Sequence, residues 1–296
     1  MDKLAERQAA TRNPLVAAPA LAVQFFLVPL AVVAVAVGVY VGFRSMLADS
    51  RTAGDYLSEI QNGGSDRRWP AAYELSRLMA DPKVRGDRAL GPALVTAYER
   101  AKSDDPLVRR YLALAIGRLD PPLPARAIDD LSQSLDDPDS EARISAIWAL
   151  GSSGDASIVA RLQPLYQSSD AGIRKMTVYA LGALPGDAQL VTLRTAVQDA
   201  APDVRWNAAV ALARHGDRQG VGVIRQMLDR QYVEHAVTRE VRPDEDRDPI
   251  ADVMISGLRA AAVLKDETLR APMAKLSQQD RSMKVRAAAI EALKSM

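Results

Sequence analysis

Two different hydrophobic patterns divide the chain. From Leu15 to Phe43 there are 29 residues without a charged side chain, and only Gln24 among them is strongly polar. From about residue 52 onwards, apolar residues recur every three or four positions in short segments, which are separated by turns rich in Pro, Gly and Asp. Because about 20 apolar residues span a bilayer, the first pattern predicts a transmembrane helix. The second predicts a series of short amphipathic helices that pack on one another.

The apolar run, residues 15–43, is expected to anchor the chain in the plasma (inner) membrane as a single-pass protein, with the helix at about 21–41. A polar tail, 1–14, precedes it and a short linker, 44–51, follows it. The alternative is a cleaved signal peptide, whose apolar region of about 7–15 residues would be shorter. Basic residues flank the run almost equally, and they favour only slightly an N-terminus in the cytoplasm with the remainder outside.

One sequence template recurs through the rest of the chain. It reads Val-Arg-x-x-Ala-x-x-Ala-Leu in its clearest form, and the segments 141–151, 172–182 and 203–213 follow it closely. Its arginines are Arg68, Arg109, Arg143, Arg174, Arg205 and Arg286. Met254 stands at the arginine position of one degenerate copy. An amphipathic segment precedes each copy, so the pattern predicts two helices per roughly 31 residues, stacked as an all-α solenoid.

The template resembles HEAT repeats, in particular the short HEAT-like repeats first associated with phycobilisome lyases. The resemblance covers residues 52–296 in about seven copies. It implies that an aspartate in the turn of each repeat and the arginine of the second helix form a structural ladder between neighbours. The residues that match this ladder are Asp105, Arg109, Asp139, Arg143, Asp170, Arg174, Asp203, Arg205 and Arg286. The alternative is that the arginines form a row that binds a ligand.

The second helix of each repeat also carries a recurring pair of non-core positions. Counted from the arginine, the first and fifth residues lie one turn apart on a face roughly opposite to the apolar one. In five repeats these positions are Trp69 and Tyr73, Arg110 and Leu114, Ile144 and Trp148, Lys175 and Tyr179, and Trp206 and Val210. All three tryptophans of the chain are among them. The resemblance places second helices on the concave surface, so we expect a groove that binds a protein or a peptide. The alternative is that the rings pack against neighbouring repeats.

One repeat contains an insertion. The step from Arg205 to Met254 is 49 residues, against 31 for each of the two preceding steps, and the extra residues form the charged segment 231–248. Insertions between solenoid helices form loops that often lie on a binding face. A solvated loop without a binding role is the alternative.

The composition of the chain argues against catalysis, metal binding and nucleic acid binding. Residues 44–296 carry 35 basic and 35 acidic residues, the chain has no cysteine, and its histidines are His215 and His235. No glycine-rich phosphate loop, serine elbow or metal-ligand spacing occurs. Deoxyhypusine hydroxylases resemble this fold but carry several His-Glu pairs, whereas this chain has only Glu234-His235. We therefore predict no catalytic residues, no metal, no cofactor, no small-molecule substrate and no nucleic acid partner.

These observations together predict a membrane-anchored HEAT-repeat scaffold or adaptor that binds a protein partner in a membrane complex. An auxiliary subunit of a transporter or secretion system is the first alternative. A HEAT-like enzyme, of the lyase or DNA glycosylase type, is the second.

Overall fold

The structure is a computed structural model that describes residues 28–47, 51–237 and 248–296. It divides the chain into two units, Met1–Thr52 and Ala53–Met296, and each is described by itself. Every regular element in the described ranges is a helix.

In the first unit, the described element is α2 (Val28–Leu47). No helix within the described ranges is long and apolar enough to span a membrane. The predicted single-pass anchor, and the plasma-membrane location and orientation that depend on it, are therefore wrong. Residues 15–27 of the predicted anchor lie outside the described residues.

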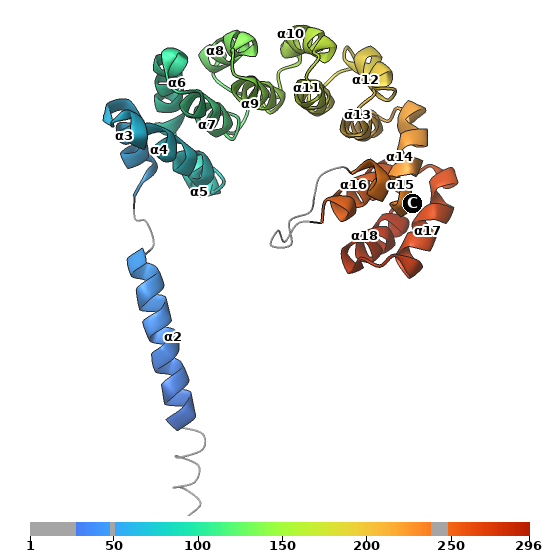
Figure 1. Cartoon of the computed structure of the whole chain (residues 1–296), viewed down its shortest axis with the longest axis horizontal. Coiled ribbons are helices and arrows are strands. Elements are labelled where there is room, and N and C mark those ends of the chain that lie inside the picture. The colour runs from blue at the N-terminus through green and yellow to red at the C-terminus, as the bar shows by residue number, and fades with distance from the viewer. Residues whose placement is uncertain (1–27, 48–50, 238–247) are drawn as a thin grey trace, which may run out of the picture. The chain divides into compact units, whose positions relative to one another are not determined.

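The second unit is a row of helical hairpins (Figure 1). The hairpins pair α3 (Ala53–Asn62) with α4 (Ser65–Leu78), α6 (Leu90–Arg100) with α7 (Pro106–Ile116), α8 (Ala125–Gln133) with α9 (Ser140–Gly151), α10 (Val159–Leu162) with α11 (Ala171–Ala183), α12 (Leu190–Ala196) with α13 (Pro202–Arg214), and α17 (Arg270–Gln279) with α18 (Met283–Lys294). Before the last pair come α14 (Val221–Met227), α15 (Arg230–Ala236) and α16 (Pro249–Leu264). The short helix α5 (Pro82–Arg85) follows α4. The all-α solenoid prediction is confirmed.

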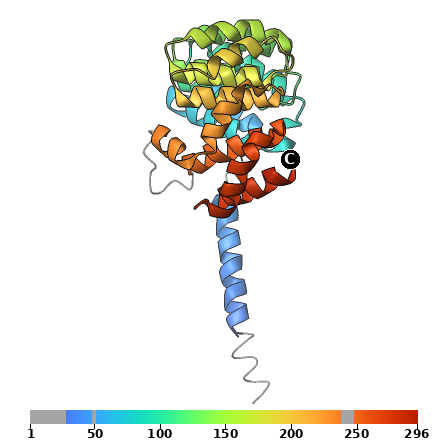
Figure 2. The same ribbon diagram turned by 90° about the vertical axis from the view of Figure 1, so that its right-hand side faces the viewer.

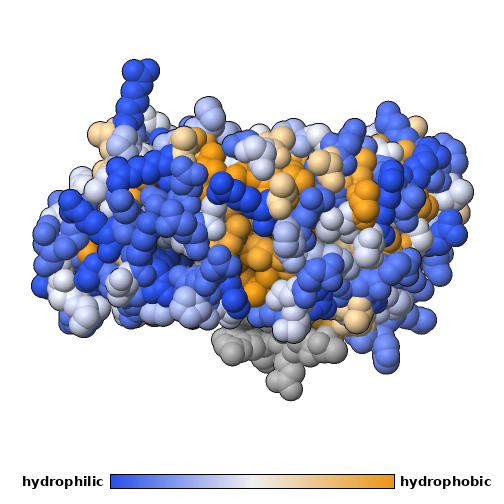
Figure 3. All heavy atoms as spheres, turned by 90° about the horizontal axis from the view of Figure 1, so that it is seen from above, coloured by the Kyte–Doolittle hydropathy of each residue, from blue (hydrophilic) through white to orange (hydrophobic). Residues whose placement is uncertain are grey.

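The second helices of the hairpins form a continuous layer. In chain order, α4, α7, α9, α11, α13, α16 and α18 each pack against the next, and we call them the inner helices. In Figure 1 they lie on the inner side of the row, with α6, α8, α10 and α12 on the outer side. Seen from the side, the helices of successive hairpins run nearly parallel (Figure 2). The outer face is mostly hydrophilic, with apolar atoms visible only in narrow strips (Figure 3).

Glycine near the end of the inner helices allows them to approach closely. A Cβ atom on Gly117 would lie 2.6 Å from the ring of Trp148 on α9, and one on Gly151 would lie 2.6 Å from the Cβ of Ala180 on α11. The Ala-Leu-Gly ending of the template therefore reflects helix-to-helix contact, because a larger side chain would force neighbouring repeats apart.

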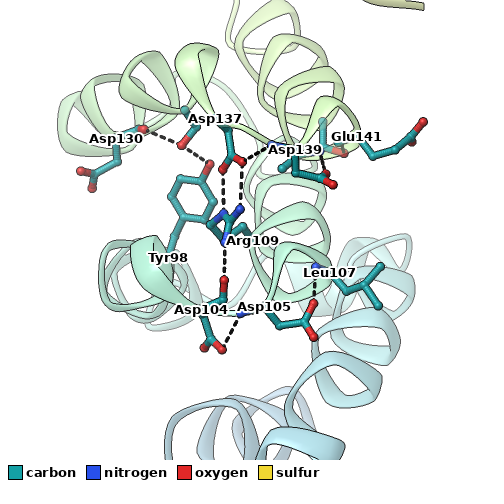
Figure 4. A network of polar contacts seen from close by, with 12 residues as sticks. Tyr98, Asp104, Asp105, Leu107, Arg109, Asp130, Asp137, Asp139 and Glu141 are labelled. Atoms are coloured by element: carbon teal, nitrogen blue, oxygen red, sulfur yellow. Dashed lines mark hydrogen bonds and ion pairs between the residues drawn. The ribbon is translucent and has the colours of Figure 1, made fainter.

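Arginines at the template position join each repeat to the next. Nε and Nη2 of Arg109 donate to the two carboxylate oxygens of Asp137 at 2.6 and 2.8 Å, and Nη1 donates to the carbonyl oxygen of Asp104 in its own repeat (Figure 4). Arg174 repeats the arrangement, with both distances to Asp199 at 2.9 Å. We call this arrangement the arginine clamp. The hydrogen bonds from Arg174 hold the pKa of Asp199 below its ordinary value, so the carboxylate stays charged.

The acids in the clamp differ from those predicted. Asp105, Asp139 and Asp170 instead cap helix N-termini, accepting hydrogen bonds from the backbone N–H groups of the first turn. Asp203 forms an ion pair with Lys175 at 3.4 Å. The acid of the clamp lies in the turn, before the residue that caps the inner helix. At that position the turn faces the preceding repeat. The carboxylate also accepts the backbone N–H two residues ahead, as Asp137 does from Asp139 at 2.9 Å.

The clamp is incomplete at three of the predicted arginines. Arg205 donates to the hydroxyl of Tyr232 at 3.0 Å, and Nη1 of Arg286 bonds only backbone carbonyls. Nε of Arg143 is buried without a hydrogen-bond partner among the described residues. The next repeat has Ser168 at the clamp-acid position, so no carboxylate faces this guanidinium.

The repeat that lacks a template arginine receives one from another helix. Met254 replaces the arginine on α16, and Arg230 of α15 donates to Asp280 in its place, at 2.8 and 2.6 Å. The two residues are 50 positions apart. The residue directly before the predicted insertion therefore completes a contact between repeats.

We expect Ser168→Asp to stabilise the protein by about 1 kcal/mol, because it supplies a carboxylate to the buried Nε of the half-buried Arg143. The serine Oγ already accepts the backbone N–H of Asp170 at 3.2 Å, so the aspartate can keep that turn. The matched control is Ser169→Asp, which adds the same charge at an exposed neighbouring position. Urea unfolding followed by circular dichroism measures both variants. Equal midpoints for the two would contradict the role given to the clamp.

Candidate partner-binding surface

The predicted columns all lie on the inner helices, but they do not form one uniform row. Trp69, Tyr73 and Tyr179 are exposed by 37%, 37% and 39%, whereas Trp206 is only 4% exposed. The others are half-buried: Arg110, Leu114, Ile144, Trp148, Lys175 and Val210. The structure gathers the polar and aromatic members into two places, one on α4 and α7 and the other on α11, α13 and α16, with Trp148 of α9 between them.

The first place is an aromatic cluster on α4 and α7. The rings of Tyr73 and Tyr111 meet edge to face, with centroids 5.1 Å apart. The guanidinium of Arg77 lies over Tyr73 at 5.7 Å, and that of Arg110 lies over Tyr111 at 5.6 Å. Arg110 also pairs with Glu141 of α9 at 3.2 Å. Tyr111 and Arg77 lie outside the two columns used in sequence analysis, and their spacing along an exposed helix face is the signal that could have found them.

Trp148 has a packing role. It is half-buried, it contacts the hydrophobic core, and its ring occupies the space opposite Gly117. The alternative interpretation, in which rings pack across neighbouring repeats, therefore describes Trp148.

The second place is a pocket of about 420 Å³ on α11, α13 and α16, which we call the α13 pocket. Four predicted residues line it: Lys175, Tyr179, Trp206 and Val210. The lining residues that the columns missed include Met176, Asn207, Arg214, Asp252 and Val253. Some of them lie on the same helices, next to the two column positions. Others lie in the degenerate repeat, where no arginine marks the position from which the columns are counted.

A second hollow of about 360 Å³ adjoins the α13 pocket and shares Lys175, Asp203, Trp206 and Val253 with it. The ion pair between Lys175 and Asp203 belongs to both linings. The roots of the insertion, Ala236–Val237 and Pro249, border the second hollow. Of the predicted insertion 231–248, residues 238–247 lie outside the described residues.

The α13 pocket combines apolar walls with groups that can form hydrogen bonds. Met176, Tyr179 and Val253 contribute apolar surface, and Arg214 and Asp252 are exposed charges that form no ion pair within the described ranges. Nε1 of Trp206 is buried and has no hydrogen-bond partner there. An unpaired buried N–H costs about 1–3 kcal/mol. Such a wall can bind an apolar side chain and orient the polar groups beside it.

The two histidines have different surroundings. Nε2 of His215 lies 3.4 Å from the side-chain nitrogen of Gln189, and His235 lies in the last turn of α15. Among the described residues, no three His, Cys, Asp or Glu side chains are grouped so as to hold a metal ion.

Comparison with known proteins identifies the repeats. A family model described as HEAT repeats matches residues 92–182 and 128–213, which correspond to α6 through α13. The chain contains HEAT repeats. The predicted resemblance to HEAT repeats is thereby confirmed for residues 92–182 and 128–213. No curated protein matches the chain.

Two solved structures are similar to the HEAT-repeat chain. An engineered protein from the Northeast Structural Genomics Consortium is 18% identical, with a TM-score of 0.44, over 82% of this chain and 95% of that one. Human deoxyhypusine hydroxylase in complex with glycerol is 18% identical, with a TM-score of 0.34, over 82% of this chain and 94% of that one. Neither likeness bears on function.

Mutations distinguish aromatic residues that pack between repeats from those that lie on the surface. We expect Trp148→Ala to lower the free energy of unfolding by about 3 kcal/mol, because it leaves a cavity opposite Gly117. Tyr179→Ala should change it by less than about 1 kcal/mol, because the ring is partly solvated. Urea unfolding of the two variants and the wild type gives both values. A large loss for Tyr179→Ala would show that this ring is a packing residue.

Proposed function

We propose that the HEAT repeats of residues 53–296 act as a non-enzymatic scaffold or adaptor, and that the inner helices bind a protein or peptide partner. The α13 pocket is the observation that carries this proposal. It brings Lys175 and Tyr179 of α11 and Val210 of α13 together with the buried Trp206 in one site with apolar walls and charged edges.

The chemistry of the lining supports a polypeptide as the ligand. Tyr179, Val210 and Met176 offer apolar contact for a side chain of the partner. Asn207 donates its amide N–H to the carbonyl oxygen of Asp203 at 2.7 Å, which leaves its own carbonyl oxygen able to accept from a backbone N–H. Arg214 and Asp252 add one charge of each sign. This mixture of an apolar centre and a polar edge is typical of protein interaction sites.

The aromatic cluster on α4 and α7 supports an extended contact surface. Tyrosine and arginine side chains that are already stacked lose little conformational entropy when a partner binds. The stacked Arg77, Tyr73, Tyr111 and Arg110 meet this condition. A partner that contacts both places would run along the inner helices from α4 to α16.

Site-specific photo-crosslinking in cells tests the proposal. A photoreactive phenylalanine analogue replaces Tyr179 in the α13 pocket in one variant and Val191 on α12 in the other. Val191 is the matched control, because it is a 71% exposed apolar residue of an outer helix. We expect a discrete protein adduct from position 179 that is absent from position 191.

The same adduct gives a quantitative readout. Tyr179→Ala should lower recovery of the crosslinked partner on affinity-tagged protein by at least about tenfold, as loss of a hot-spot residue does, and Val191→Ala should not. Identical adduct patterns from both positions, or full recovery with Tyr179→Ala, would contradict a partner site on the inner helices.

A further inference from the structure

Four inner helices follow a turn that has an equivalent position six residues before the template arginine. Asp137, Asp199 and Asp280 occupy this position before α9, α13 and α18. Each carboxylate accepts the backbone N–H two residues ahead, at 2.8–2.9 Å, and binds an arginine of another helix. Before α11 the residue is Ser168, and its Oγ accepts the backbone N–H of Asp170 at 3.2 Å. Ser168 therefore has the position and the turn geometry of the clamp acid without its charge.

The arginine opposite this serine lacks a partner within the described chain. By the register of the complete clamps, it is Arg143 of α9. In those clamps Nε and Nη2 of the arginine bind both carboxylate oxygens of the acid, as Arg109 binds Asp137 (Figure 4). Arg143 forms no hydrogen bond and no ion pair among the described residues, and its Nε is buried. An unpaired guanidinium and an uncharged clamp residue thus meet at the junction between α9 and α11.

A group attached to Ser168 can reach this guanidinium more readily than a free anion can. Because Nε of Arg143 is buried, a free anion would have to enter between two packed repeats. A substituent on Oγ of Ser168 begins inside the turn. The serine is half-buried, and Gln167, Ser169 and Asp170 beside it are exposed. Its hydroxyl donates no hydrogen bond within the described residues, so another group can replace the proton.

The charges around the turn suit an anionic group. Nη1 of Arg174 donates to the carbonyl oxygens of Ser168 and Ser169 at 2.9 and 3.1 Å, so a second guanidinium lies beside the serine. The carboxylate of Asp170 accepts two backbone N–H groups in the first turn of α11, which partly compensates its charge. A phosphate carries a charge of about −1.5 to −2 and three acceptor oxygens, which match arginine N–H groups. Phosphoserine is longer than aspartate, and Arg143, with no hydrogen bond to break in the described chain, can withdraw to receive it.

We propose that Ser168 is a phosphorylation site, and that its phosphate completes the clamp between α9 and α11 by binding the guanidinium of Arg143. A protein kinase transfers the γ-phosphoryl group of a nucleoside triphosphate to Oγ of the serine. The new O–P bond forms as the bond between the γ-phosphorus and its bridging oxygen breaks. The nucleoside diphosphate leaves, and the hydroxyl proton passes to a base of the kinase. The modification strengthens the junction between the repeats that carry the aromatic cluster and those that carry the α13 pocket.

Incorporation of phosphoserine at position 168 during translation of the full chain tests the pairing. We expect the midpoint of urea unfolding to rise by about 0.5 M relative to the unmodified chain, because the phosphate gains charge-assisted hydrogen bonds. Arg143→Gln should remove this rise. In the unmodified chain the same substitution should leave the midpoint near the wild-type value, because the guanidinium has no partner to lose among the described residues. Phosphoserine in place of Ser169 is the matched control, since it adds the same charge at an exposed neighbour.

Three results would overturn the pairing: no rise from position 168, an equal rise from position 169, or a rise that persists in Arg143→Gln. Inorganic phosphate examines the free anion. We expect it to change the midpoints of the unmodified wild type and of Arg143→Gln equally. A stabilisation by inorganic phosphate that requires Arg143 would show that the junction binds a free anion, and the proposal of a modified serine would be overturned.

Mass spectrometry of the chain isolated from its own cells, with phosphatases inhibited, tests whether the modification occurs. Trypsin releases residues 162–174, whose hydroxyl side chains are those of Tyr166, Ser168 and Ser169. Fragment ions distinguish these three positions, and we expect phosphate on Ser168. A peptide that carries no phosphate on Ser168 in any growth phase, or carries it on Ser169 alone, would overturn the assignment.

Discussion

The structure of residues 53–296 depends on the arginine clamp. Each complete clamp joins three points, the arginine's own helix, the turn before that helix and the turn of the next repeat, through charge-assisted hydrogen bonds of 2.6–2.9 Å. The helices are short, and an isolated hairpin of this length would not be stable in water. Contacts between neighbours therefore determine both stability and geometry. Where the template arginine is missing, at Met254, another arginine, Arg230 of α15, binds the clamp acid Asp280.

The candidate sites follow from this constraint. Because the clamp fixes the rotation of each inner helix, the core positions face neighbours and the first and fifth residues after the arginine point to the inner side. The degenerate repeat interrupts the regular contact beside α13, and the α13 pocket lies at that interruption, with Met227 of α14 and Val253 of α16 in its lining. Regular packing and this departure from it thus account for the α13 pocket, the surface proposed to bind a partner.

Periodicity predicted the solenoid because it is a local property repeated many times, and the arginine spacing located the inner helices. The choice of acid could not be predicted, because Asp137 and Asp139 are two residues apart and only the direction of the turn decides which one faces Arg109. Whether Trp148 and Trp206 are exposed or buried depends on how closely the neighbouring helix approaches. The glycine opposite Trp148 sets that distance. The anchor prediction placed a spanning helix at about 21–41, whereas the described helix is Val28–Leu47 and is not long and apolar enough to span a membrane. Arg230 was missed because its partner is 50 residues away.

A double-mutant cycle on Arg109 and Asp137 tests the central claim most directly. The two residues lie in different repeats, both are largely buried, and they form a complete clamp with hydrogen bonds of 2.6 and 2.8 Å. The account predicts a coupling free energy of about 2–3 kcal/mol between Arg109→Ala and Asp137→Ala in equilibrium unfolding. The cycle of Arg109 with Asp139, which caps its own helix, should give a coupling near zero. Additive effects for Arg109 and Asp137, or an equal coupling with Asp139, would contradict the claim that the clamp holds neighbouring repeats together.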